Sequence, residues 1–352
     1  MVPENVLIDE KPIPVLGWDV GGAHLKAALL DGRGVVLHVI QVACPLWRGL
    51  AELEHAIDQV LGGLPIKPAR HAVTMTGELV DLFESRAAGV NAISKLLTRK
   101  LDGAIRFYAG LKGFVDIEQV ALNTDSIASA NWLASSCFVA EKAPNALFID
   151  IGSTTSDLVP IANGKVLAQG ASDAARMRLS ELLYSGVVRT SLMALGPKVL
   201  FDRDLTHLAA EHFATTADVY RLTGDLLAED DMAETADGHG KTAIESARRL
   251  ARMIGHDVEY AALEVWVKLA ENFKEIQLQR LQEAAEQVSK LSPSATLVGA
   301  GAGKFLVPKL AERMSQPYMD AVELIQAHSA ELRHVSALCL PAYAVAYLAL
   351  KD

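Results

Sequence analysis

The chain has 352 residues, and its 43 acidic residues outnumber its 33 lysines and arginines, for a net charge of -10. Proteins that bind nucleic acids usually present a basic surface, because phosphate contacts dominate their affinity, so this charge argues against a nucleic-acid partner. The composition, 51% hydrophobic and 22% charged, excludes an intrinsically disordered chain. The length suits two lobes better than a single hydrophobic core.

Cysteine usage and hydropathy point to a reducing compartment. The three cysteines, Cys44, Cys137 and Cys339, are far apart and form no C-x-x-C pair, so neither a disulfide framework nor a zinc ribbon is expected. Residues 1–14 lack the apolar core of a signal peptide, and no apolar run reaches membrane-spanning length. We therefore expect a cytoplasmic protein without a membrane partner, and the sequence leaves a homo-oligomer open.

In chain order, strands alternate with helices in the first half of the chain, and helices dominate the second half. The predicted helices span residues 50–61, 81–88, 91–101, 124–136, 218–229, 242–254, 259–289, 307 onward and 335–350, and the predicted strands outside the repeat described next span residues 70–75, 105–108 and 295–298. This alternation predicts an α/β fold. We expect one lobe over residues 13–120 plus 335–352, and a second over 121–334 with a largely helical insertion over about 201–290.

Two stretches, residues 15–30 and 147–161, follow one pattern: an apolar strand, Asp-x-Gly, a small or polar turn, and a second apolar strand. A glycine turn and a third short strand follow each stretch. The matched positions are Asp19 with Asp150, Gly21 with Gly152, and Val35 with Val166. Hairpins with glycine turns are common, but the same Asp-x-Gly at the same place in both favours a duplicated β-meander.

The first Asp-x-Gly turn has the residues of a phosphate loop. Gly21 and Gly22 allow a ligand to approach the backbone, and successive amides there would form an anion-binding nest. Asp19 would repel a bare phosphate, so its expected partner is hydrated Mg²⁺, which binds through one or two carboxylates plus substrate phosphates. Lys26 on the return strand is suited to a phosphate oxygen. A solvated strand lysine remains an equal alternative.

The second turn offers hydroxyls and amides to phosphate oxygens. Its candidate residues are Asp150, Gly152, Ser153, Thr154, Thr155 and Asp157. Asp150 again suits a metal-bound water, which makes Asp19 and Asp150 the two candidate metal-facing carboxylates. The alternative is a polar hairpin whose Ser and Thr side chains cap their own turn. That alternative explains Thr155, but not a carboxylate at the matching place in both copies.

A third glycine-rich loop, with Gly299, Gly301 and Gly303, lies between a predicted strand and helix. Its spacing is neither the dinucleotide fingerprint nor a P-loop, and it gains meaning as a third phosphate wall beside the two hairpins. Glu78 and Asp81 follow Thr76-Gly77 at a predicted helix start. Acids are favoured in a first helical turn by the macrodipole, so a structural and a functional role both stay open for them.

The two hairpins and the late glycine-rich loop together resemble the fold shared by actin, sugar and acetate kinases and heat-shock ATPases. This resemblance implies two duplicated ribonuclease-H-like lobes facing a central cleft. It also implies that residues 19–26 are phosphate loop one, residues 150–157 phosphate loop two, and residues 299–303 an adenosine-type loop.

The stretches "FIDIGSTTSDLVPI" (148–161) and "TMTGELVDLF" (74–83) resemble the hydantoinase/oxoprolinase family, and within it a subfamily linked to tetrahydromethanopterin one-carbon metabolism. Further similar stretches are residues 73–81, 130–132 with Asn131, 184–190 and 213–220. The methanogen members are methanofuran-biosynthesis synthases, and a methylotroph member would make the methylofuran equivalent. The resemblance implies a transferase that joins an aminomethylfuranmethyl diphosphate to the phenol of a γ-glutamyltyramine-type acceptor and releases diphosphate.

That chemistry is coherent with the loops. A furfuryl diphosphate ionises readily because the furan oxygen spreads the developing cation, so amides, Lys26 and Mg²⁺ would mainly stabilise the departing diphosphate, without ATP. Glu78 or Asp81 would take the phenol proton. Two alternatives stay open: an ATP-dependent kinase or hydantoinase/oxoprolinase-like amidohydrolase, and a non-catalytic nucleotide-binding protein. The latter has no need of the carboxylates of Asp19, Asp150 and Asp157.

Overall fold

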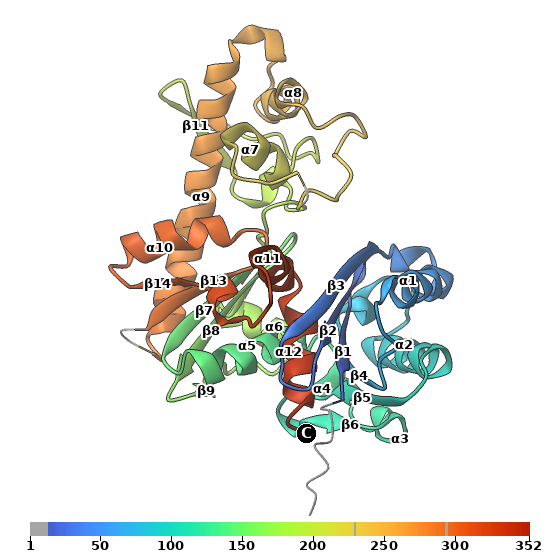
Figure 1. Cartoon of the computed structure of the whole chain (residues 1–352). Coiled ribbons are helices and arrows are strands. Elements are labelled where there is room, and N and C mark those ends of the chain that lie inside the picture. Colours follow the sequence, from blue (N-terminus) through green and yellow to red (C-terminus); the bar gives the residue numbers. More distant parts are fainter. Residues whose placement is uncertain (1–12, 229, 293–294) are drawn as a thin grey trace, which may run out of the picture. The chain divides into compact units, whose positions relative to one another are not determined.

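A computed structural model describes residues 13–228, 230–292 and 295–352, so most of the segment expected to lack a signal peptide lies outside the described residues (Figure 1). The chain forms two compact units. Unit 1 comprises Met1–Phe138 and Leu324–Asp352, and unit 2 comprises Val139–Glu323. The last strands and helices of the chain therefore divide between the units, and unit 1 is built from both ends of the sequence.

These unit boundaries lie 18 and 11 residues from the predicted lobe boundaries at 120 and 334, and the reason is packing. Phe138 contacts Tyr343 and Tyr347 edge-on, with ring centroids 5.0 and 5.1 Å apart. Ser129 binds Glu78 through its hydroxyl. Residues 121–138 thus belong with the first sheet, although the sequence assigned them to the second lobe.

Unit 1 is organised around a six-stranded sheet of order β3-β2-β1-β4-β5-β6. β1 pairs antiparallel with β2 and parallel with β4. The strands are β1 Val15–Val20, β2 His24–Leu30, β3 Val36–Ala43, β4 Arg70–Met75, β5 Ala104–Tyr108 and β6 Phe114–Val115. The helices are α1 Leu50–Gly63, α2 Arg86–Lys100, α3 Ile117–Val120, α4 Thr124–Ile127, α5 Asn131–Lys142, which continues into unit 2, α11 Ala330–Leu338 and α12 Leu340–Ala349.

Alternation along β1 explains how this sheet is covered. Leu16, Trp18 and Val20 share one apolar cluster with the inner faces of α1 and α2. Gly17 points to the other face, where a Cβ would overlap the carbonyl oxygen of Ala342 in α12. The strand is therefore buried on both faces, with α12 lying against it in Figure 1.

Unit 2 repeats the arrangement with a sheet of order β10-β8-β7-β13-β14, in which β9 also pairs with β8. β7 pairs antiparallel with β8 and parallel with β13, as β1 does with β2 and β4. The elements are β7 Ala146–Ile151, β8 Ser156–Ala162, β9 Lys165–Val166, β10 Leu182–Leu183, β13 Thr296–Ala300, β14 Tyr318–Asp320, α6 Asp173–Arg178 and α10 Val307–Arg313. The duplication is thus visible in strand order, and the predicted α/β fold class is confirmed.

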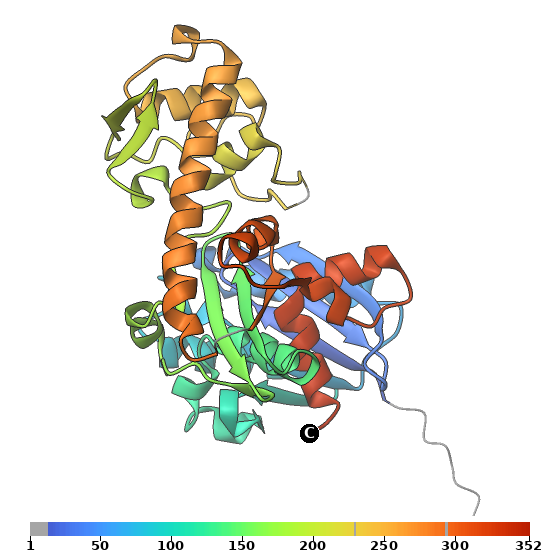
Figure 2. The ribbon, with the colours of Figure 1, turned by 90° about the vertical axis from the view of Figure 1, so that its left-hand side faces the viewer.

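The insertion in unit 2 is largely helical and also contains a two-stranded hairpin that the sequence did not reveal. Its elements are β11 Lys198–Phe201, β12 Asp204–His207, α7 Thr216–Thr223, α8 Ala243–Met253 and α9 Leu263–Ser289. In Figure 2, α9 runs as one long helix from the insertion along the unit 2 sheet. Its buried residues include Trp266, Phe273 and Leu281, which lie in one apolar cluster with α7 and α8.

Among the predicted helices that differ from the observed ones, three show why. The prediction of a helix over 81–88 was wrong, because Ser85 caps α2 by accepting a hydrogen bond from the Ala88 amide, so the helix begins at Arg86. The predicted helix 124–136 is divided into α4 and α5 around Ser129, whose φ of 52° is left-handed. The predicted C-terminal helix is two helices, α11 and α12, that bend by 97°.

In the described part of the chain, no single helix is both long and apolar enough to span a membrane, although the bent α11–α12 pair passes the same test by length and composition.

Candidate functional site

The two Asp-x-Gly turns, loop one (residues 19–26) and loop two (150–157), fold alike. In loop one the Gly21 amide donates to the His24 carbonyl at 3.0 Å, and in loop two the Gly152 amide donates to the Thr155 carbonyl at 2.8 Å. The register is the same, because Asp19 lies opposite Lys26 and Asp150 lies opposite Asp157. The sequence alignment of the two copies therefore holds at the level of single hydrogen bonds.

The carbonyls of both turns are directed into the protein. Amides of Leu46 and Cys44 donate to the Gly22 and Ala23 carbonyls of loop one. In loop two the amides of residues 187–189 donate to the Gly152 and Ser153 carbonyls at 2.9–3.1 Å. None of the hydrogen bonds among the described residues uses the amides of Gly22, Ala23, Ser153, Thr154 or Thr155. Successive free amides of this kind make an anion-binding nest.

Asp19 forms a row across the unit 1 sheet with Lys26 on β2 and Thr74 on β4, since these three are register partners. Asp19 is only 6% exposed, and its Oδ1 has no hydrogen-bond partner within the described structure. Burial raises the pKa of Asp19, and the Lys26 charge opposes that rise. The Lys26 ammonium also donates to the Leu338 carbonyl at 3.1 Å. This hydrogen bond is part-buried and fixes the lysine side chain, which is therefore not simply solvated.

Glu78 lies in a short 3₁₀ turn, Gly77–Leu79, that follows β4 and abuts loop one. Gly77 makes this possible, because a Cβ there would meet the carbonyl oxygens of Val20 and Gly21. Glu78 is 2% exposed, and its Oε1 accepts a 2.8 Å hydrogen bond from the Ser129 hydroxyl. Burial raises the pKa of Glu78 to about 7, which suits proton transfer near neutral pH.

Unpartnered polar atoms gather at this end of the unit 1 sheet. Asp19 Oδ1, Thr74 Oγ1 and Glu78 Oε2 are all buried and lack hydrogen bonds in the described structure. Buried polar atoms normally have hydrogen-bond partners, so three such atoms on or just after two adjacent strands indicate a place for a ligand, an ion or water. Asp81, predicted beside Glu78, is instead exposed in the turn before α2.

The glycine-rich loop packs on loop two in unit 2. Gly301 has a φ of 78°, and a Cβ there would overlap the Asp150 carboxylate and the Ile151 carbonyl. The Gly303 amide donates to that same Ile151 carbonyl at 2.8 Å. Gly299 is different, because it lies within β13 and its surroundings are Val307 and Tyr318. The structure therefore brings Gly301 and Gly303, but not Gly299, to the loop.

Asp157 and Asn131 have local partners. The Asp157 carboxylate forms a 2.8 Å ion pair with the buried guanidinium of Arg176 in α6. Burial raises the pKa of Asp157, and Arg176 opposes that rise. The Asn131 Oδ1 accepts from the Trp132 amide at 2.8 Å at the start of α5. Both contacts hold local structure, and facing a metal would require Asp157 to leave Arg176.

A magnesium site fits the donors that the structure provides. In the described ranges no three or more His, Cys, Asp or Glu side chains gather as in a metal site built entirely from protein ligands. Mg²⁺, however, typically keeps several waters and needs only one or two carboxylates plus substrate phosphates. The orphaned Oδ1 of Asp19 in unit 1 and the half-buried Asp150 carboxylate in unit 2 each suit that kind of binding.

Sequence reasoning missed four residues of these surroundings: Thr74, Ser129, Arg176 and Arg189. Thr74 was discoverable, because a polar residue in the apolar strand 70–75 is a visible exception. The other three depend on chain segments that only tertiary folding brings to the loops.

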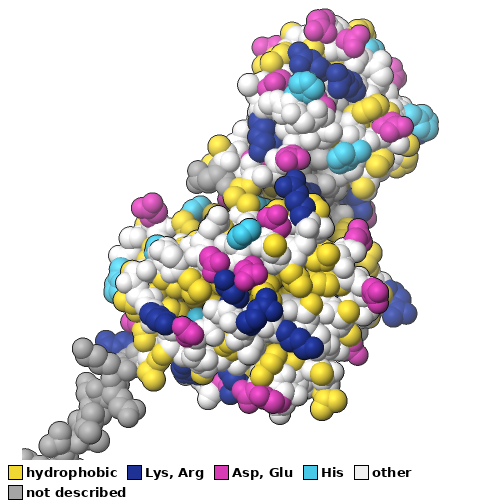
Figure 3. Space-filling view, turned by 90° about the vertical axis from the view of Figure 1, so that its right-hand side faces the viewer, with side chains coloured by type: hydrophobic (Ala, Val, Ile, Leu, Met, Phe, Trp, Pro, Cys, Tyr) yellow, Lys and Arg dark blue, Asp and Glu magenta, His cyan; other side chains and the backbone are white. Residues whose placement is uncertain are grey.

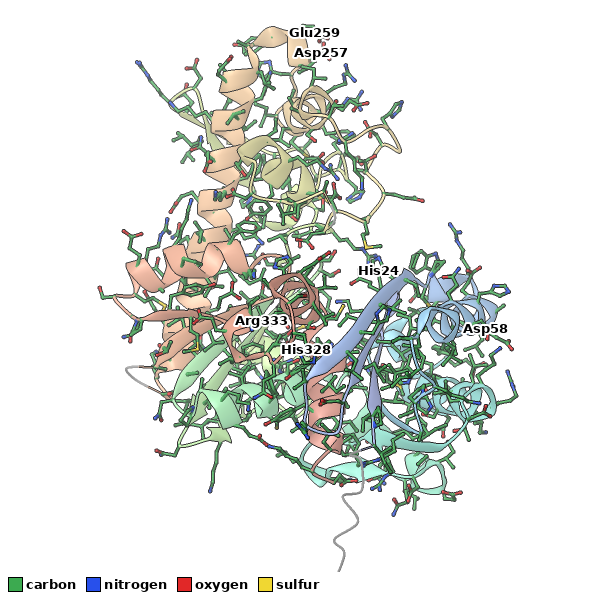
Figure 4. All side chains as sticks on the ribbon, viewed as in Figure 1. His24, Asp58, Asp257, Glu259, His328 and Arg333 are labelled. Atoms are coloured by element: carbon green, nitrogen blue, oxygen red, sulfur yellow. The ribbon has the colours of Figure 1, made fainter. Side chains whose placement is uncertain are left out.

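Figure 4 shows His24 at the loop-one end of β2, whereas Asp58 lies on the outer side of α1. The face in Figure 3 carries acidic and basic side chains intermixed, without a basic stripe.

Comparison with known proteins gives one match over nearly the whole chain and a second over part of it. The chain is 28% identical to the (4-{4-[2-(gamma-L-glutamylamino)ethyl]phenoxymethyl}furan-2-yl)methanamine synthase of Methanocaldococcus jannaschii, over 97% of this chain and 98% of that protein. A protein of the same name from Methanococcus vannielii is 29% identical over 46% of this chain and 72% of its own length.

Two solved structures are similar over nearly all of both chains. One is a glucokinase of the ROK family from Streptomyces griseus, with a TM-score of 0.48, 11% identity and coverage of 96% of this chain and 100% of that one. The other is component A of the (R)-2-hydroxyglutaryl-CoA dehydratase of Acidaminococcus fermentans, with a TM-score of 0.48, 13% identity and coverage of 97% of this chain and 100% of that one. The model of the hydantoinase/oxoprolinase family matches residues 70–330. That range contains Glu78, Ser129, loop two and the glycine-rich loop, and the chain therefore belongs to the hydantoinase/oxoprolinase family.

Proposed function

We propose that this protein is a transferase of methanofuran-type cofactor biosynthesis. It would join the methylene carbon of an aminomethylfuranmethyl diphosphate to the phenol oxygen of a γ-glutamyltyramine-type acceptor and release diphosphate. The observation that carries the proposal is the 28% identity along 97% of the chain to a synthase whose name contains this phenoxymethylfuran ether. A place in tetrahydromethanopterin-linked one-carbon metabolism, including that of a methylotroph, belongs to the same proposal.

The two loops support the proposal because diphosphate is the group to be held. In the transfer, the carbon–oxygen bond to diphosphate breaks and diphosphate leaves with the electron pair. Free amides in each loop, and the Lys26 ammonium in loop one, are donors of the kind that would stabilise this developing negative charge. Mg²⁺ bound through Asp19 or through Asp150 would supply further neutralisation of the leaving group.

Glu78 supports the acceptor half of the reaction. The phenol oxygen forms the new bond to the furfuryl carbon, and its proton must go to a base. Glu78 has one oxygen held by Ser129 and the other without a partner in the described structure, so the free oxygen can accept that proton. A pKa raised to about 7 makes the carboxylate a stronger base than an exposed glutamate. No step requires ATP.

The test is an assay of the purified protein with Mg²⁺, the furfuryl diphosphate donor and γ-glutamyltyramine, without ATP. Mass spectrometry follows the ether, and a coupled assay follows released diphosphate. We expect both products in equal amounts. Ether formation only after ATP is added, or ATP turnover without ether, would contradict the proposal and favour an ATP-dependent kinase or amidohydrolase on the same loops.

A further inference from the structure

Loop two is backed by residues 185–190, a segment that we call the strap. Gly186 lies so close to the loop that a Cβ there would overlap the Ser153 backbone and the Thr154 amide nitrogen. The strap amides of Val187, Val188 and Arg189 donate to the Gly152 and Ser153 carbonyls at 3.0, 3.1 and 2.9 Å. The strap therefore occupies the carbonyl side of the turn and leaves its amides for an anion.

The strap is itself fixed on its other side by the insertion. The Gly186 carbonyl accepts from the Thr216 hydroxyl at 2.9 Å and from the side-chain amide of Gln277 at 3.0 Å. The Gly186 amide donates to the Thr190 hydroxyl at 2.8 Å, and the Thr216 amide donates to the Thr190 carbonyl at 2.8 Å. Contacts thus hold the strap on both sides of Arg189, and its backbone position relative to loop two is well defined.

Loop two lacks a cation of its own. It contains two carboxylates, Asp150 and Asp157, and the nearby Arg176 and Lys304 are already engaged. Arg176 pairs with Asp157 at 2.8 Å and donates to the Glu181 carbonyl at 3.0 Å. Lys304, which follows the glycine-rich loop, pairs with Asp320 at 2.8 Å. Because Arg176 compensates the charge of Asp157, amides alone must then hold an anion beside the Asp150 carboxylate, unless another positive side chain contributes.

Arg189 meets this need. Its amide nitrogen is 2.9 Å from the Ser153 carbonyl, so its side chain starts at the edge of the loop. The side chain is exposed, and the contacts of the described residues include no ion pair or hydrogen bond of its guanidinium. An extended arginine side chain reaches across a turn of four residues and presents a fork that matches two phosphate oxygens.

We infer that Arg189 is an anion-binding residue of loop two, where its guanidinium and the amides of residues 153–155 bind the diphosphate group. The identity of that group as the leaving group of the donor rests on the proposed function, whereas binding of the anion does not. Arg189 would neutralise charge of the bound anion, which Asp150 otherwise repels, and a lysine would serve less well because it lacks the fork.

The experiment measures binding of inorganic pyrophosphate with Mg²⁺ by calorimetry to the full chain and to R189A, R189K and R203A. Arg203 is the matched control, since it is an exposed arginine of the same unit at the β11–β12 turn, and its removal changes the net charge equally. We expect about tenfold weaker binding for R189A, a smaller loss for R189K, and no change for R203A. Circular dichroism checks that each variant is folded.

Equal pyrophosphate affinity of R189A and the wild type, or equal losses in R189A and R203A, would overturn the inference. The KM for the diphosphate donor separates it from the proposed function. If no ether is formed but pyrophosphate binding depends on Arg189, the anion site stands and the transferase proposal fails. If ether forms and R189A changes neither the donor KM nor pyrophosphate affinity, the transferase stands and the role of Arg189 fails.

Discussion

Glu78 combines burial with a hydrogen bond from the Ser129 hydroxyl, and the two set both its proton affinity and its effect on stability. The Ser129 hydroxyl is a neutral donor, so it offsets only part of the desolvation that raises the pKa of Glu78 from 4.5 to about 7. An acid whose folded pKa is raised binds its proton more tightly in the native state. The contribution of Glu78 to stability is then greatest below pH 4.5 and is lost as pH rises through 7.

Glu78→Gln separates function from stability. The amide is neutral and isosteric, so the variant avoids a desolvation cost on the order of 3 kcal/mol that the wild type carries above pH 7. We expect the variant to have a free energy of unfolding equal to the wild type near pH 4.5 and higher at pH 8, measured by urea denaturation at both values. A variant less stable than the wild type at pH 8 would contradict this, because it would show that the ionised Glu78 carboxylate has stabilising hydrogen-bond partners in the folded protein.

Glu78→Gln should lower catalytic activity, although it raises stability at pH 8. If Glu78 is the base, kcat/KM of the wild type rises with pH to a plateau, with a midpoint near 7, since only the ionised form accepts the phenol proton. Glu78→Gln should lower kcat by about 100-fold or more and abolish that rise, while pyrophosphate affinity stays unchanged. Asp81→Asn is the control, because Asp81 is exposed, and its activity should match the wild type.

At the scale of elements, a buried hydrogen-bond chain connects the insertion to the strap. The Tyr220 hydroxyl of α7 donates to the side-chain oxygen Oε1 of Gln277 at 2.5 Å. The side-chain nitrogen Nε2 of Gln277 donates to Ser185 Oγ and to the Gly186 carbonyl, both at 3.0 Å. All of these groups are buried. One glutamine of α9 therefore satisfies polar atoms of both α7 and the strap, which is how a helix in the insertion supports loop two.

Gln277→Leu tests that support. The substitution keeps the volume of the side chain but leaves the Tyr220 and Ser185 hydroxyls short of a partner in a buried place, so we expect the free energy of unfolding to fall by about 2–4 kcal/mol. Gln279→Leu on the exposed face of the same helix removes only a surface contact to Glu283 and should change it by less than about 0.5 kcal/mol. Equal effects of the two substitutions in thermal or urea unfolding would rule out the buried chain as a stabilising element.

At the scale of the whole chain, unit 1 depends on residues from both ends of the sequence. β1 begins at Val15 and α12 ends at Ala349, and the two meet where Gly17 leaves room for the Ala342 carbonyl. Any side chain at residue 17 would separate the helix from the strand. The C-terminal helix is therefore a structural part of the first sheet, although more than 300 residues of chain lie between them.

Gly17→Ala should lower the free energy of unfolding by about 2 kcal/mol or more, since the added methyl group overlaps a backbone carbonyl that cannot move freely. Gly62→Ala is the matched control. Gly62 lies in α1 with no atom near the place of a Cβ, and alanine is the better helix former, so stability should be unchanged or rise by up to about 1 kcal/mol. Chemical denaturation of both variants checks the difference, and a Gly17→Ala variant as stable as the wild type would contradict this packing.

The sequence by itself determined the elements that rest on local patterns. The strand over Arg70–Met75, the helix from Leu50 and the duplicated Asp-x-Gly hairpins all follow from apolar periodicity and glycine placement, which act over a few residues. The family also followed from two short stretches, 74–83 and 148–161, and the match over residues 70–330 confirms it. The roles of the candidate site residues, including Mg²⁺ at Asp19 and Asp150, remain predictions.

Only the tertiary structure decided which polar groups are paired and which are left free. Lys26 and Asp157 occupy equivalent positions, yet one binds the Leu338 carbonyl and the other binds Arg176, because different segments cover the two sheets. Glu78 and Asp81 looked alike in the sequence. Glu78, however, is buried beside Ser129 and its pKa is raised by burial, whereas Asp81 is exposed to solvent. Solvation and long-range partners set the chemistry of a charged side chain, and neither is encoded in its sequence neighbours.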